Sequence, residues 1–329
     1  MNPDYEVVIG LEVHVQLNTK SKIFCSDANS FGELPNRHTS VISLAHPGTL
    51  PRVNKKAINK GIQLALALGA KINKENRFDR KHYFYPDVPK AYLITQDRLP
   101  ICVGGKLDLY EGKDLRTIQF HHTHMEEDAG KSVHDIDPSN SLIDLNRAGT
   151  PLLEIVTEPD LRSAQEVHDF IATLQHLVRY IGISDANMEE GSLRADCNVS
   201  VRKKGETILN NRCEIKNVNS KRFAKEAVTY EAKRQIALME RGETVDQQTL
   251  TFDPETGKTS SIRDKEDAHD YRYFPDPDLP PVFISDEEIA ELEKDMPILP
   301  NKQAQIYQGK GINQEHINVI IQELSLIHI

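Results

Sequence analysis

The chain has 329 residues, enough for one large domain or two ordinary ones with a buried core. Its formal net charge of -10 and its pI near 5.7 argue against a protein that coats nucleic acid by bulk electrostatics, although a local basic patch could still hold one. The four cysteines show no CxxC spacing and follow no secretory signal, and no apolar run approaches the ~20 residues of a membrane span. We therefore expect a cytoplasmic protein with free thiols and no membrane partner.

The first predicted element is a strand over residues 7–17, where apolar and polar residues alternate. Its polar face carries Glu12, His14 and Gln16. A strand over residues 192–202 alternates in the same way and places Arg194 and Asp196 on one face. Buried carboxylates on strands are costly unless a cation meets them, whereas the solvated face of an antiparallel sheet shows the same alternation. The pattern alone therefore predicts either a polar cleft or an outer surface.

Three helices are predicted from capping residues and from apolar residues at helical spacing. The first runs over residues 54–69 with Asn54 as its N-cap. The second runs over residues 163–182, where Ser163 and Glu166 match an S-x-x-E capping box, and the third runs from about residue 220 to 242. Strand-like pieces lie between them without a regular βαβ alternation. This mixture predicts an α+β fold with a largely antiparallel sheet.

A proline-rich passage over residues 274–283 breaks regular structure, and acidic helical sequence follows from Ser285. We place a domain boundary near Pro297, with residues 1–296 as one domain and residues 297–329 as the beginning of a helical one. The second part is too short to form a stable domain alone. The chain is thus expected to stop inside a domain, and its last residues, SLIHI, cap nothing recognisable.

Two motifs suggest sites that the residues do not support. The run GKTS at residues 257–260 lacks the glycine that a phosphate loop needs five residues earlier, where Phe252 stands, so a hairpin turn is predicted. His121, His122, His124 and His134 suggest a zinc or nickel site, but strand alternation splits the first three across two faces. Ordinary polar histidines are the favoured interpretation. No GxSxG or GxGxxG motif is present.

Two segments combine aromatic and basic residues with little aliphatic content, residues 79–96 and residues 261–281. The first includes Lys81 and Tyr83, and the second includes Arg263, Tyr271 and Arg272. Such a segment can line a channel or hold phosphates, and it can also be a tyrosine-rich surface loop. The repetition of this chemistry within one chain favours a site.

Seven segments together carry a family resemblance that covers nearly the whole chain: IGLEVHVQL, RKHYFYPDVPKAY, HMEEDAGK, DLNRAGTPLLEIVTEPDL, MEEGSLRADCNVSVR, CEIKNVNS and KEDAHDYRYFPDPDLPP. They closely resemble the GatB family, the B-type subunits of the bacterial aspartyl/glutamyl-tRNA amidotransferases. The resemblance implies a cradle-shaped catalytic domain related in fold to glutamine synthetase, then a helical domain and a tRNA-binding tail. The tail is expected to be missing here.

The resemblance also implies a reaction in which ATP and Mg²⁺ activate the side-chain carboxylate of mischarged Glu-tRNA(Gln) or Asp-tRNA(Asn), which ammonia then amidates. Residue by residue, it assigns the metal to Glu12, His14, Glu127 and Glu154. It assigns catalysis to Glu127, Glu154, Asp196 and Lys81. For the nucleotide phosphates we choose Lys81, Arg194, Lys216 and Arg263, with Arg272 as an alternative, because these basic residues interrupt otherwise acidic or neutral motifs. Because neighbouring strand residues point to opposite faces, Glu126 is the alternative to Glu127.

The implied partners are a glutaminase (amidase) subunit, which supplies ammonia through an internal channel, a small third subunit of the heterotrimer and the mischarged tRNA. Nothing recognisable in this sequence would release ammonia from glutamine. Two other functions stay open: a noncatalytic tRNA-binding scaffold, and a free-standing ATP-dependent amide ligase that acts on a small amino acid. A requirement for charged tRNA would separate the ligase from the amidotransferase.

Overall fold

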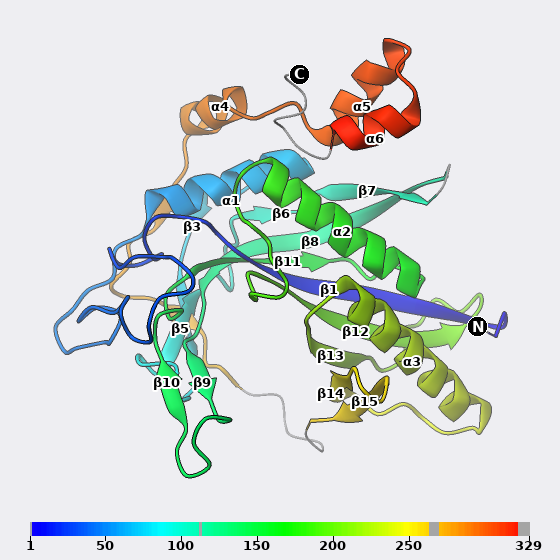
Figure 1. The fold of residues 1–329 in the computed structure, drawn as a ribbon, viewed down its shortest axis with the longest axis horizontal. Helices are drawn as coiled ribbons and strands as arrows, with labels where there is room; N and C mark the ends of the chain where they lie inside the picture. The colour runs from blue at the N-terminus through cyan, green and yellow to red at the C-terminus, as the bar shows by residue number, and fades with distance from the viewer. Residues whose placement is uncertain (1, 112–113, 263–269, 322–329) are drawn as a thin grey trace.

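The computed structural model describes residues 2–111, 114–262 and 270–321, and its centre is a large sheet of mainly antiparallel strands (Figure 1). In the described strands only β13 and β14 run parallel. The strands lie side by side in the order β15 (Lys258–Ser261), β14 (Gln248–Asp253), β13 (Cys213–Val218), β12 (Leu193–Lys203), β1 (Tyr5–Gln16), β11 (Pro151–Thr157), β8 (Asp114–Glu127), β6 (Cys102–Val103) and β2 (Lys71–Ile72), and β7 (Lys106–Glu111) also pairs with β8. The expected α+β class is confirmed, whereas the relation to glutamine synthetase stays a prediction.

Strand β1 lies at the middle of this sheet, between β11 and β12. Its odd-numbered residues, from Val7 to Val15, are buried in the main core, as the sequence alternation predicts. Each fully buried Val, Leu or Ile contributes about 1.5–3 kcal/mol, so this alternation fixes the register of β1 strongly. Glu12, His14 and Gln16 consequently share the other face of the sheet.

Three helices pack against the apolar face of the sheet (Figure 1). They are α1 (Lys55–Leu68), α2 (Ala164–Tyr180) and α3 (Lys221–Glu240), and all three predicted helices are confirmed. Asn54, Ser163 and Ser220 cap their N-termini as side-chain acceptors. The α2 capping box is only half formed, because the Glu166 carboxylate accepts from the Arg162 N–H rather than from the Ser163 N–H.

A three-stranded sheet formed by β5 (Tyr92–Thr95), β4 (Asp79–His82) and β16 (Phe274–Pro275) joins the two aromatic and basic segments. Phe274 lies opposite Arg80, and the His82 and Phe274 rings stack with centroids 4.9 Å apart. The two segments with similar chemistry are therefore neighbours in space. Two smaller pairs complete the strands: β9 (Lys131–Val133) with β10 (Leu142–Asp144), and β3 (Glu75–Asn76) with β17 (Val282–Phe283).

A bulge in β8 changes the expected placement of two histidines. Val156 of β11 lies opposite His122 and Thr157 lies opposite Phe120, so His121 is an extra residue without a partner in this pairing. The Nδ1 atoms of His121 and His122 come within 2.7 Å of each other. The prediction that alternation separates these two rings is therefore wrong, because the bulge interrupts the alternation.

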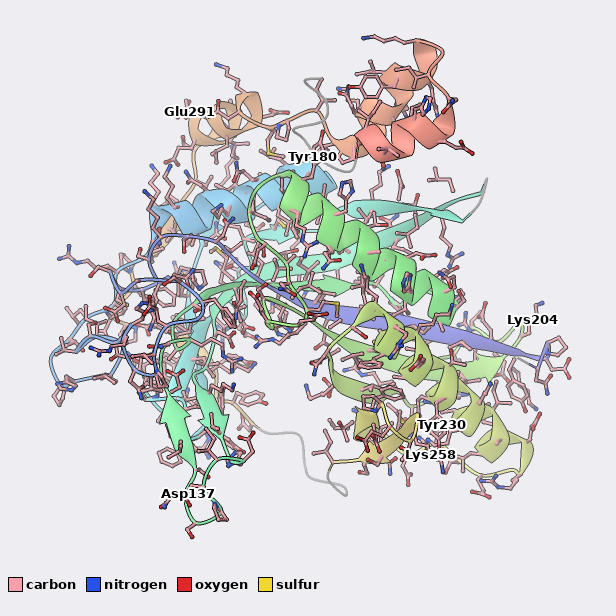
Figure 2. All side chains as sticks on the ribbon, viewed as in Figure 1. Asp137, Tyr180, Lys204, Tyr230, Lys258 and Glu291 are labelled. Atoms are coloured by element: carbon pink, nitrogen blue, oxygen red, sulfur yellow. The ribbon has the colours of Figure 1, made fainter. Side chains whose placement is uncertain are left out.

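Three short helices follow the proline-rich passage: α4 (Asp286–Lys294), α5 (Pro300–Gly309) and α6 (Gln314–Ile320). Ser285 and Glu288 form a complete capping box for α4. Figure 2 shows Tyr180 at the end of α2 close to this region, where its hydroxyl donates to the Ile298 carbonyl oxygen at 2.9 Å. The boundary near Pro297 stays a prediction. The GKTS run forms the predicted hairpin between β14 and β15, and none of the helices in the described parts is long and apolar enough to cross a membrane.

Candidate active site

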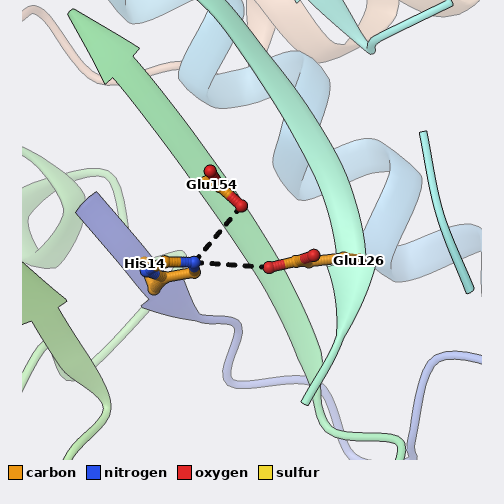
Figure 3. A group of neighbouring side chains, drawn as sticks. All are labelled: His14, Glu126 and Glu154. Atoms are coloured by element: carbon orange, nitrogen blue, oxygen red, sulfur yellow. Dashed lines mark ion pairs between the residues drawn. The ribbon is translucent and has the colours of Figure 1, made fainter. Parts of the chain in front are cut away.

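The polar face of the central strands gathers three ionisable side chains into a compact group, which we call the His14 cluster: His14, Glu126 and Glu154 (Figure 3). They come from β1, β8 and β11. His14 Nε2 lies 3.2 Å from Glu154 Oε2 and 3.4 Å from Glu126 Oε1. Register explains the arrangement, because His14 lies directly opposite Glu154 and the two side chains therefore share a face.

An imidazolium balances the two carboxylates of this cluster. Burial alone would lower the pKa of His14, but the hydrogen bonds to Glu126 and Glu154 raise it to about 10. Burial acts against ionisation of Glu154 as well, and its bonds to His124 and His14 hold its pKa well below the usual value. The cluster therefore carries a positive charge between its two carboxylates at neutral pH.

The donor set of the His14 cluster fits a divalent cation. Glu126 Oε2 is buried and has no hydrogen-bond partner among the described residues, although a buried carboxylate oxygen normally has one. Two carboxylates and one imidazole within 4.8 Å of one another can coordinate Mg²⁺ or Mn²⁺, which both accept carboxylate ligands. A cation at this place would meet the unpaired oxygen and replace the His14 proton.

Glu127, which the family motif assigned to the metal, lies apart from the His14 cluster. Its carboxylate is buried, bonds Lys90 Nζ at 2.7 Å and accepts the Ile94 N–H at 2.8 Å. It also lines a pocket of about 220 Å³ together with Tyr92 and Gly149. Alternation explains the difference, since Glu126 and Glu127 leave β8 on opposite faces. The geometry thus favours the alternative, Glu126, and the assignment of Glu127 to the metal stays a prediction.

A second group on the same face, the Glu12 cluster, consists of Glu12, Asp196 and Glu214. They come from β1, β12 and β13, and Glu12 lies opposite Asp196. Burial raises the pKa of Glu12, and the negative charges of Glu154 and Glu214 raise it further. A divalent cation would stabilise the ionised forms of three carboxylates this close, so this group also fits a metal. The structure therefore places the residues assigned to metal and catalysis in two groups.

Lysines lie beside both clusters. Lys216 Nζ bonds Glu214 at 2.7 Å and lies 3.4 Å from Asp196. Lys81 on β4 is close to the His14 cluster: burial would lower its pKa, but the charge of Glu126, followed by those of Tyr273 and Glu154, raises it overall. Both ammonium groups keep their charge and face acidic residues.

The structure describes only one of the other two residues predicted to hold phosphates, Arg194 and Arg263. Arg194 lies opposite His14, but its guanidinium bonds Asp128 at 3.1 Å. Burial would raise the pKa of the Asp128 carboxyl, but the charge of Arg194 lowers it overall. The donors of Arg194 are thus partly occupied by a structural ion pair. Arg263 lies outside the described residues.

A pocket of about 430 Å³ opens beside the Glu12 cluster. Apolar side chains and amides line it, together with Glu12 and Gly10 of β1. The remaining lining residues that matter here are Val156, Asn198, Leu209, Asn210, Asn211 and Gln247. Asn198 donates to Glu12 at 3.0 Å, whereas its Oδ1 atom is buried without a partner among the described residues. A polar ligand next to Glu12 would supply that partner.

A family model described as "GatB/GatE catalytic domain" matches residues 7–290, a span that includes both clusters and the pocket. The chain belongs to the GatB/GatE catalytic domain family. The resemblance predicted from the seven sequence segments is thereby confirmed.

Curated relatives extend this match to individual proteins. The B subunit of an aspartyl/glutamyl-tRNA(Asn/Gln) amidotransferase from Neisseria meningitidis serogroup A is 55% identical over 300 residues, which cover 91% of this chain and 63% of that protein. Proteins of the same name from Anaeromyxobacter sp. and Anaeromyxobacter dehalogenans are 48% and 51% identical over 97% and 93% of this chain. The chain spans 63% to 66% of the length of these relatives.

Within this GatB/GatE domain, sequence reasoning missed Glu214 as a cluster residue and preferred Glu127 over Glu126. Glu214 and Lys216 alternate with buried residues on β13, which pairs with β12. That alternation, in the segment CEIKNVNS, was the available signal. No such signal chose between Glu126 and Glu127, because which of two adjacent residues at a strand end faces the cluster depends on what the strand packs against.

Proposed function

We propose that the chain is the catalytic part of a tRNA-dependent amidotransferase that uses ATP to activate the side-chain carboxylate of Glu-tRNA(Gln), Asp-tRNA(Asn) or both. One observation carries the proposal: two three-residue groups fit for divalent cations lie on one face of the sheet and are joined through Glu12 and His14 of β1. Family membership and the names of the relatives support the substrate class. The observation itself supports phosphate chemistry.

The proposed reaction has two steps. A carboxylate oxygen of the aminoacyl group attacks the γ-phosphorus of ATP, and ADP leaves. Ammonia then attacks the acyl carbon, inorganic phosphate leaves, and the new amide nitrogen gives up a proton. Mg²⁺, when bound to the clusters, supplies charge neutralisation at the phosphates. Glu126 and Glu154 would hold it in the His14 cluster, and Asp196 and Glu214 in the other.

Each flanking lysine has a defined part in this proposal. Lys81 places an ammonium beside the His14 cluster and would hold the transferred phosphate by charge. Lys216 would bind a phosphate oxygen after leaving Glu214 and Asp196, with which it is paired in the structure. The pocket beside Glu12 would take the nucleoside, since its amides can read polar edges and Leu209 and Val156 can contact a base.

The remaining parts of the proposal rest on the family resemblance. Ammonia would come from a glutaminase subunit through an internal channel, a small third subunit would join the pair, and the reaction would take place in the cytoplasm. The division into a catalytic domain over residues 1–296 and a helical part over residues 297–329 belongs to the same proposal, as does the relation to the glutamine synthetase fold.

The test is an assay of ATP conversion and of amidated aminoacyl-tRNA with this chain and its partner subunits. It uses Mg²⁺, ammonium ions and mischarged Glu-tRNA or Asp-tRNA, with correctly charged tRNA as the control substrate. We expect amide product that depends on both ATP and mischarged tRNA. Amide formed on a free amino acid would establish the independent ligase instead, and tRNA binding without ATP turnover would establish the scaffold.

A further inference from the structure

Three imidazole rings on β8 form a row that begins at the surface and ends at the His14 cluster. His121 is exposed, and its Nδ1 lies 2.7 Å from the Nδ1 of His122. His122 Nε2 lies 3.1 Å from the Nδ1 of the more buried His124. The rings of His122 and His124 stack with centroids 5.2 Å apart and planes 15° from parallel. The bulge in β8 creates this row, because a regular strand would have turned His121 away.

The tautomer of His124 is set by Glu154. Its Nε2 lies 3.2 Å from Glu154 Oε2, so that nitrogen carries the hydrogen and donates it to the carboxylate. The Nδ1 of His124 then faces His122 Nε2, 3.1 Å away. A carboxylate that accepts from one ring nitrogen while the other nitrogen faces outward is the usual support of a metal-binding histidine.

His122 is also prepared to act as a ligand. Its Nδ1 contact with His121 can hold the ring with Nε2 toward His124. Two nitrogens 3.1 Å apart subtend about 100° at a metal with Zn–N distances of about 2.0–2.1 Å, an angle that tetrahedral and octahedral sites both accept.

We propose that His122 and His124 form a site for a borderline divalent transition-metal ion, such as Zn²⁺ or Ni²⁺, distinct from the two carboxylate clusters. Imidazole pairs select such ions, whereas carboxylate sites suit Mg²⁺ and Mn²⁺. His121 is a positioning residue that orients the His122 ring. Water would complete the coordination. The inference stands on the geometry of β8 and does not depend on the proposed function.

This site would be one imidazole ring away from the His14 cluster. A metal on His124 Nδ1 makes its Nε2–H a stronger donor, and that hydrogen points at Glu154, a carboxylate that His14 also contacts. Occupation of the site should therefore reduce the affinity of the His14 cluster for its own cation. Transition metals would regulate the cluster without binding to it.

Calorimetric titration of the untagged chain with Ni²⁺, in excess Mg²⁺ to fill the carboxylate clusters, tests the proposal. We expect one equivalent to bind, with the affinity reduced about tenfold or more in His122→Gln and less strongly in His121→Ala. His134→Gln is the matched control, since His134 is exposed in the β9–β10 hairpin and contacts Ser141, and it should leave the affinity unchanged.

Wild-type affinity in His122→Gln would overturn the proposal. So would Ni²⁺ binding that disappears in Glu126→Gln but survives in His122→Gln, because the ion would then belong to the His14 cluster. A second measurement avoids dependence on the folding of a variant: long-range ¹H–¹⁵N spectra of the wild-type histidines during Zn²⁺ addition. We expect His122 Nε2 and His124 Nδ1 to shift together, and unchanged signals would contradict the site.

Discussion

The His14 cluster and the Glu12 cluster lie on the same face of one sheet but balance their carboxylates differently. In the first, a buried imidazolium stands between Glu126 and Glu154. In the second, Lys216 reaches the carboxylates from a side chain that is 40% exposed. A metal that enters the first cluster can displace the imidazolium proton of His14, whereas a metal that enters the second requires the Lys216 side chain to move away. The comparison indicates that cation binding is linked to proton release at one cluster and to side-chain movement at the other.

The largest effect is expected from Glu126→Gln, which removes a carboxylate from the His14 cluster alone. Mn²⁺ binding, followed by electron paramagnetic resonance, should fall from two sites to one. ATP turnover in the assembled enzyme should fall on the order of a hundredfold, because charge stabilisation at the transferred phosphate is lost. Glu189→Gln, on an exposed turn, is the control. Two remaining Mn²⁺ sites in Glu126→Gln would contradict the assignment of this residue.

The next effect concerns the neighbouring glutamate and is one of stability. Glu127→Ala leaves the partly buried Lys90 ammonium and the Ile94 N–H without their acceptor. Breaking such a buried pair costs about 3 kcal/mol or more in free energy of unfolding. Urea denaturation measures this loss, and both Mn²⁺ sites should persist in the folded variant. If Glu127→Ala instead removed a Mn²⁺ site at unchanged stability, the original family assignment would be right.

The pH dependence of stability should distinguish the two clusters in the absence of metal. The pKa of His14 is about 10 in the folded protein, above its ordinary value near 6.5. Its contribution is therefore fully present below pH 6.5 and is lost as the pH rises toward 10. Thermal unfolding in a chelator should show a steeper loss of stability over this window in the wild type than in His14→Gln.

The same linkage has a direct readout. Mn²⁺ binding to the His14 cluster should release about one proton near neutral pH, since the metal replaces the imidazolium proton. Calorimetry in buffers of different ionisation enthalpy measures that number. Glu214→Gln, which changes only the Glu12 cluster, should leave the release intact, while His14→Gln should abolish it. A release that survives in His14→Gln would assign the proton to another group.

Much of this architecture is predictable from the sequence because single strands and helices are marked by local patterns of apolar residues and by capping residues. Alternation places Glu12 and His14 on one face of β1, and Asn54, Ser163 and Ser220 mark the helix starts. The family motifs identify the other strands that carry carboxylates. These features depend on residues near in sequence, so a linear reading is sufficient.

The remaining features depend on packing between distant segments. The choice between Glu126 and Glu127 is decided where β8 meets Lys90 and β5, and the division of the carboxylates into two clusters is decided by the pairing of β13 with β12. The bulge that joins His121 to His122 arises from one unpaired residue in the β8–β11 ladder. None of these contacts leaves a periodic signal in its own segment.

The smallest expected effect is at Lys216, where the proposed roles of counter-ion and phosphate ligand have opposite consequences. Lys216→Met removes a cation that competes for Glu214 and Asp196, so Mn²⁺ affinity at the Glu12 cluster should rise about threefold, within the roughly 1 kcal/mol of a partly exposed ion pair. Affinity at the His14 cluster should not change. If Lys216 also binds a phosphate oxygen, the KM for ATP rises in the same variant. An unchanged KM with tighter Mn²⁺ binding would leave Lys216 as a counter-ion alone, and an unchanged Mn²⁺ affinity would show that it does not compete with the metal.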